Sequence, residues 1–144
     1  MKVADLIGSR NEVFSITEDA SVHQAAQYLR EKQVRSVGVV SAGGKVVGVI
    51  SHSDVSDKVA AENKCPAWMK ASEIMTCELV TVTPQMSLED CLRLMEQNTI
   101  FHLIVLDEKQ GFLGMLSVSD TLRVVASDEK ARADLFESFI FPQR

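Results

Sequence analysis

The chain has 144 residues, of which 46% are hydrophobic and 24% charged, the composition of an ordinary soluble globular protein. A net charge of −5 argues against a nucleic-acid-binding protein, whose footprint is normally basic, and no apolar run approaches the roughly 18–20 residues of a membrane helix. The first residues, MKVADLIGSRNE, lack the apolar block of a signal peptide, so we expect a cytoplasmic protein with reduced cysteines.

The first half of the chain predicts the element order β-α-β-β-α. A short β run, VFSI, is followed by a helix that opens at Ser21 in an S-x-x-Q pattern close to a capping box. A strand at 36–40, a turn containing Gly-Gly and a strand at 45–50 come next. The last strand leads into Ser51-x-Ser53-Asp54, where a second helix begins.

The second half repeats this order with every residue number raised by 66. Residues 13–59 lie over 79–125 without a gap, and although only eight of the 47 positions are identical, the apolar pattern is kept. The pieces ADLI at 4–7 and SEIM at 72–75 also resemble each other. We therefore predict an α/β (α+β) fold of two β-α-β-β-α units related by a pseudo-two-fold axis.

The predicted boundaries follow the repeat. The first unit covers 1–60, a linker broken by Pro66 covers 61–70, the second unit covers 71–126, and a helical tail covers 127–144. The tail carries apolar residues at i,i+4 spacing within 128–141. Such a stripe folds back on its own domain or is buried against a second chain, and we favour the second.

Both units end in the same motif, Gly, two apolar residues, Ser, one variable residue, Ser and Asp. It reads GVISHSD at 48–54 and GMLSVSD at 114–120. A Ser-x-x-Asp segment is an ordinary helix cap, but a helix N-terminus also favours phosphate, and a carboxylate there can accept both hydroxyls of a ribose. The repeated motif is thus either a copied cap or a copied binding site, and the two can coexist.

The repeated motif resembles the signature of the CBS domain, named after cystathionine β-synthase, in its usual tandem pair. The resemblance spans about residues 1–126 and implies nucleotide sites in the clefts between the paired units. It implies that Asp54 and Asp120 hold ribose hydroxyls, with Ser51 and Ser117 beside them. Adenine would lie against the start of the second strand of each unit, at Val34, Arg35, Ser36, Ile100, Phe101 and His102. The cations placed for a phosphate are Lys32, Arg35, Lys58 and Arg123.

The function predicted from this resemblance is a regulatory module that binds an adenine nucleotide, AMP, ADP, ATP or NAD(H), and transmits its state to a partner. CBS pairs usually form dimers, so a homodimer is expected. The alternative is an interaction protein with decayed sites. It is favoured by Lys32-Gln33 and Asn98-Thr99, which stand where many members carry His-Arg. No nucleophile–base set, metal cluster or Walker-type loop is present, so we predict no enzyme activity, no catalytic cofactor and no metal site.

Overall fold

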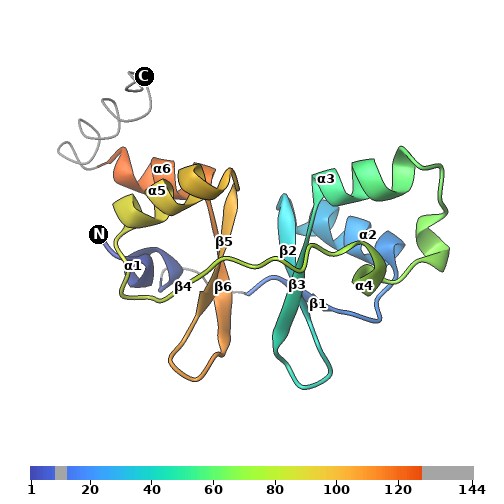
Figure 1. Cartoon of the computed structure of the whole chain (residues 1–144), viewed down its shortest axis with the longest axis horizontal. Helices are drawn as coiled ribbons and strands as arrows, with labels where there is room; N and C mark the ends of the chain where they lie inside the picture. The colour runs from blue at the N-terminus through green and yellow to red at the C-terminus, as the bar shows by residue number, and fades with distance from the viewer. Residues whose placement is uncertain (9–12, 128–144) are drawn as a thin grey trace.

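Two units, each built around a three-stranded sheet, lie side by side in the computed structural model, which describes residues 1–8 and 13–127 (Figure 1). The elements of the first unit are β1 (Ser15–Thr17), α2 (Val22–Lys32), β2 (Ser36–Val40), β3 (Val46–Ser51) and α3 (His52–Val55), which continues as a π-helix over Ser56–Ala60. Those of the second unit are β4 (Thr81–Val82), α5 (Leu88–Asn98), β5 (His102–Leu106), β6 (Phe112–Ser117) and α6 (Val118–Val125). Outside this order lie α1 (Val3–Ile7), a 3₁₀ helix at Pro66–Trp68 and α4 (Ala71–Ile74).

Strand pairing is the same in both units. β1 runs parallel to β2, and β2 runs antiparallel to β3, with Ser36 opposite Ser51. β4, β5 and β6 repeat this arrangement, with His102 opposite Ser117. The predicted β-α-β-β-α order is therefore confirmed in both halves. β1 and β4 begin two residues later than predicted, because their pairing with the neighbouring strand begins at Ser15 and Thr81.

The helix starts follow the predicted serines. The Ser21 hydroxyl accepts a hydrogen bond from the Gln24 N–H at 3.0 Å, and the Gln24 side chain accepts one from the Ser21 N–H at 2.9 Å, which completes a capping box. Ser87 accepts from the Asp90 N–H at 3.1 Å in the second unit. These bonds satisfy N–H groups that have no partner within the helix, and so they define where α2 and α5 begin.

The two short helices α1 and α4 are exchanged between the units. Val3 and Leu6 of α1 are buried in the hydrophobic core of the second unit. Ala71 and Ile74 of α4 are buried in the core of the first unit. Backbone bonds support the exchange, since the Val3 N–H donates to the Met86 carbonyl at 2.9 Å and the Ala71 N–H donates to the Ala20 carbonyl at 2.7 Å. Each core is thus completed by the short helix that directly precedes the other unit in the chain.

The two sheets meet closely where β2 approaches β6 (Figure 1). A Cβ placed on Gly38 would lie 2.6 Å from the Phe112 ring, so a side chain at this position would force the ring to move. Gly38 therefore permits the close approach of the two units, and this approach brings the first unit's residues near the motif of the second.

All three cysteines are free. Cys91 is fully buried in the second core, and burial, with Asp90 and Glu89 nearby, raises the pKa of its thiol to about 11. Within the described residues, no helix is both long and apolar enough to cross a membrane. The predicted tail helix, 128–141, lies outside the described residues.

Candidate functional site

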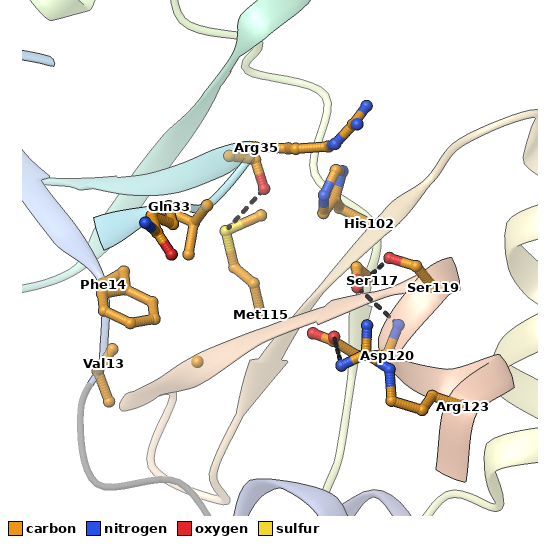
Figure 2. Close-up of a pocket in the computed structure, with 13 residues that line it drawn as sticks. Val13, Phe14, Gln33, Arg35, His102, Met115, Ser117, Ser119, Asp120 and Arg123 are labelled. Atoms are coloured by element: carbon orange, nitrogen blue, oxygen red, sulfur yellow. Dashed lines mark hydrogen bonds and ion pairs between the residues drawn. The ribbon is translucent and has the colours of Figure 1, made fainter. Parts of the chain in front are cut away.

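A cleft with a volume of about 580 Å³ lies between the two units. Ligand pockets commonly have volumes of roughly 300–1,000 Å³, so a nucleotide-sized molecule fits. Its walls come from both halves of the chain (Figure 2). The lining residues are Val13, Phe14, Gln33, Val34, Arg35, Ser36, His102, Gly114, Met115, Ser117, Ser119, Asp120 and Arg123.

The second unit contributes the N-terminus of α6. The Ser117 hydroxyl accepts from the Asp120 N–H at 3.1 Å and lies 3.3 Å from the Ser119 hydroxyl. The Asp120 side chain keeps 42% of its surface exposed, and its carboxylate lies 3.8 Å from the Arg123 guanidinium. The cap and an accessible carboxylate thus coexist at the same helix end, which favours negative ligand groups through its N–H groups and dipole.

The first unit contributes the opposite wall, from the end of α2 to the start of β2. Arg35 is exposed, Val34 is half-buried, and the buried Ser36 hydroxyl lies 3.9 Å from the Met115 sulfur. Phe14 packs edge-on against Tyr28, with 6.4 Å between ring centroids. Phe14 and Met115 make an apolar region, while Arg35 and Asp120 make a polar one, as Figure 2 shows.

Two of the four predicted phosphate-binding cations line the cleft. These are Arg35 and Arg123. The Lys32 ammonium lies 5.8 Å from the centroid of the Tyr28 ring. The Lys58 ammonium lies 2.9 Å from the Asp54 carboxylate and donates to the Ile74 carbonyl at 2.8 Å. The structure therefore brings one predicted cation from each unit to the cleft.

The first copy of the motif lies outside this cleft. Ser51 caps α3 by accepting from the Asp54 N–H at 3.3 Å, and its own N–H donates to the Asp54 carboxylate at 2.9 Å. Asp54 is buried, with 7% of its surface exposed. Ile100 packs against the core of the second unit, and Phe101 is 70% exposed. Neither of these two residues lines the cleft, so Val34, Arg35, Ser36, His102, Ser117, Asp120 and Arg123 are the predicted site residues that the structure brings together.

The prediction omitted several lining residues. Met115 alternates with the fully buried Leu116 in β6, so strand periodicity could have shown that its side chain faces away from the core. Ser119 stands inside the quoted motif and could also have been included. Phe14, Gln33 and Gly114 reach the cleft through the packing of one unit on the other, which local patterns do not encode.

His102, which lines the cleft, should make the stability of the fold depend on pH. Burial lowers the pKa of His102, and the nearby Asp120 carboxylate partly opposes that shift. The imidazole of His102 therefore binds a proton more readily in the unfolded chain than in the folded one. The free energy of unfolding is highest, as far as His102 contributes, above about pH 6.5, and it decreases as pH falls below that value. We expect His102→Gln to lose less unfolding free energy than the wild type between pH 7.5 and 5.5 in urea titrations. Equal losses would show that His102 does not contribute.

Comparison with known proteins identifies the repeated unit. A family model described as the CBS domain matches residues 3–61 and again residues 71–127. A mitochondrial CBS domain-containing protein of Arabidopsis thaliana is 29% identical over 86% of this chain, which spans 62% of that protein. A CBS domain-containing protein of Bacillus subtilis is 27% identical, with 86% of each chain covered. A homoserine O-acetyltransferase of Methanocorpusculum labreanum is 33% identical over 85% of this chain, which spans only 23% of that enzyme.

Solved structures agree on the fold. A CBS-domain signal-transduction protein, described as putative, from Burkholderia ambifaria superposes with a TM-score of 0.82 at 26% identity, over 90% of this chain and 96% of that one. A CBS domain protein from Pyrobaculum aerophilum, complexed with AMP, superposes with a TM-score of 0.80 at 18% identity, over 94% of this chain and 98% of that one. A CBS domain pair in complex with 5′-methylthioadenosine and S-adenosylmethionine superposes with a TM-score of 0.78 at 23% identity, over 88% of this chain and 97% of that one.

Proposed function

The chain belongs to the CBS-domain family, and on that premise we propose that it is a regulatory module that binds an adenine nucleotide between its two units. One observation carries the proposal. The accessible Asp120 carboxylate, at the N-terminus of α6, lines the same cleft as Arg35 of the other unit. A carboxylate can accept hydrogen bonds from sugar hydroxyls, and a guanidinium can pair with phosphate oxygens.

The proposed binding mode divides the nucleotide between the two walls. Asp120 accepts hydrogen bonds from the ribose hydroxyls, and the Ser117 hydroxyl lies beside it. Adenine lies against Val34, Arg35 and Ser36, with the apolar region of the cleft near its faces. The phosphate is held by the guanidinium groups of Arg35 and Arg123, which form charge-assisted hydrogen bonds with phosphate oxygens.

Relatives with the same fold support this choice of ligand class. The Pyrobaculum protein was solved with AMP, and another CBS pair was solved with two adenosine-containing sulfur compounds. At 18% and 23% identity these structures establish a shared fold only. The choice between a nucleotide and an adenosine-containing sulfur compound therefore rests on the residues of this chain. Two arginines in the cleft favour an anionic nucleotide over S-adenosylmethionine, whose sulfonium is a cation.

Regulation would act through the cleft, because its walls belong to different units. A ligand that contacts both walls shifts the equilibrium toward the arrangement that it binds more tightly. We propose a cytoplasmic homodimer that passes this change to a protein partner, acting as a binding module and not as an enzyme. The chain spans well under two thirds of several relatives, and the acetyltransferase resemblance is confined to 23% of that enzyme.

Thermal unfolding with matched ligands tests the proposal. We expect AMP at 100 times its dissociation constant to stabilise the protein by about 2.7 kcal/mol. Adenosine, which lacks the phosphate, should give a clearly smaller shift at equal concentration, because it cannot pair with the two arginines. ATP, NAD, NADH and S-adenosylmethionine complete the panel. No shift with any of these compounds would contradict nucleotide binding and favour an interaction protein.

A further inference from the structure

The two copies of the motif differ in what surrounds their aspartates. The Asp54 side chain is 10% exposed, and four groups of the chain hold its carboxylate. These are the Lys58 ammonium at 2.9 Å, the Ser51 N–H at 2.9 Å, the Ser51 hydroxyl at 3.2 Å and the Thr76 hydroxyl at 3.2 Å. Asp54, Lys58, Ser51 and Thr76 are called the Asp54 cluster below. At Asp120, by contrast, 42% of the side-chain surface is exposed on the cleft.

Two positions of the Asp54 cluster carry different residues in the second half of the repeat. In the register of the repeat, Lys58 corresponds to Val124, which carries no charge. In the register that aligns ADLI with SEIM, Thr76 corresponds to Gly8, which has no hydroxyl. The lysine and the threonine that hold Asp54 are therefore not repeated at the corresponding positions of the second copy.

The cations of the cleft are in turn missing from the first copy. Arg35 corresponds to Phe101, and Arg123 corresponds to Asp57. A phosphate placed at the first copy would meet an aromatic ring and a carboxylate where the cleft has two guanidinium groups. The carboxylate repels the phosphate, and the ring offers no hydrogen-bond donor.

The segment that follows α4, called the crossing segment below, is hydrogen-bonded to β3 beside the first copy of the motif. Val49 and Thr76 exchange two backbone hydrogen bonds, at 3.0 and 2.8 Å, and Figure 1 shows this segment crossing the middle of the molecule toward β4. Met75 fills the space beside Gly48, because a Cβ on that glycine would lie 2.5 Å from the Met75 sulfur. Gly114, the equivalent glycine, lines the open cleft.

We propose that each chain binds one nucleotide, at Asp120, and that Asp54 instead fastens the crossing segment to α3. This inference rests on the proposed function. The Lys58 ammonium and the Thr76 hydroxyl occupy the carboxylate that a ribose would otherwise use. The repeat thus carries one binding site and one structural copy of that site.

Titration calorimetry with AMP and thermal unfolding, on the full chain and on three variants, test this inference. The wild type should bind one AMP per chain. Asp120→Asn should remove measurable binding and lower the melting temperature little. Asp54→Asn, the matched change in the other copy, should keep one AMP per chain with affinity within about twofold. It should lower the melting temperature by about 4 °C or more, because it disrupts the Asp54 cluster. Thr76→Val should behave in the same way with a smaller thermal effect.

Other outcomes separate the two claims. Two AMP molecules per chain, or a loss of affinity in Asp54→Asn with the fold intact, would overturn the inference and leave the proposed function standing. If the wild type binds no AMP, the proposed function fails. In that case the melting temperatures still decide the structural claim, which is overturned if Asp54→Asn is no less stable than Asp120→Asn.

Discussion

Replacing Asp120 with alanine should weaken AMP binding by at least about a hundredfold. The change removes two charge-assisted hydrogen bonds to the ribose, which are together worth about 3 kcal/mol or more. Asp120 stands in the first turn of α6, whose N-cap is Ser117, so the cost to fold stability should be about 1 kcal/mol or less. Titration calorimetry measures the affinity, and urea unfolding measures the stability.

Glu89→Ala is the control for the Asp120 variant. Glu89 is also a carboxylate in the first turn of a helix, α5, but it does not line the cleft. Its replacement should leave AMP affinity unchanged. If Asp120→Ala loses about 1 kcal/mol of stability and keeps its affinity, the second motif is only a cap.

Ile74→Ala should destabilise the protein by about 2–5 kcal/mol. Ile74 is 2% exposed and belongs to the core of the first unit, although in the chain it follows the linker at 61–70 that leads to the second unit. Truncation removes buried apolar surface and leaves a cavity, because the surrounding side chains close in only partly. Urea unfolding followed by circular dichroism gives the change in free energy.

Glu78→Ala provides the comparison for Ile74, because Glu78 lies four residues further along the same segment and is exposed. Its replacement should change stability by less than about 0.5 kcal/mol. Similar small effects for both variants would mean that α4 does not complete the first core, and the exchange of helices would be wrong.

Much of the fold could be predicted because the responsible signals are local. β2 and β5 cover the predicted residues, since apolar runs of β-branched and long side chains stand between clear turns and helix ends. Ser21 and Ser87 mark the helix starts because their hydroxyls bond N–H groups only three residues ahead.

The exchange of α1 and α4 could not be predicted in the same way. Val3 and Leu6 form an apolar pair that any nearby core could bury, and nothing in their spacing says which. The choice depends on long-range backbone bonds such as that from Val3 to Met86. Such bonds join segments far apart in the chain, so local spacing does not reveal them.

Part of the difference between the two motifs lay beyond the local sequence pattern. The repeated Ser-x-Ser-Asp segments predicted a nucleotide site at each of the two aspartates. Asp54 is buried because Thr76 arrives from the crossing segment and Lys58 lies one turn further along the helix. The opposing wall of the cleft at Asp120 comes from the first unit, in particular Arg35. The contacts of Thr76 and Arg35 are set by packing between segments far apart in the chain, whereas that of Lys58 is local.

A crystal structure of the full chain grown with AMP tests the central claim most directly. The nucleotide should lie between the two units, with its ribose hydroxyls on the Asp120 carboxylate and its phosphate near Arg35 and Arg123. The Lys58 ammonium should still pair with Asp54. A nucleotide bound at Asp54, or bound away from both motifs, would contradict the account.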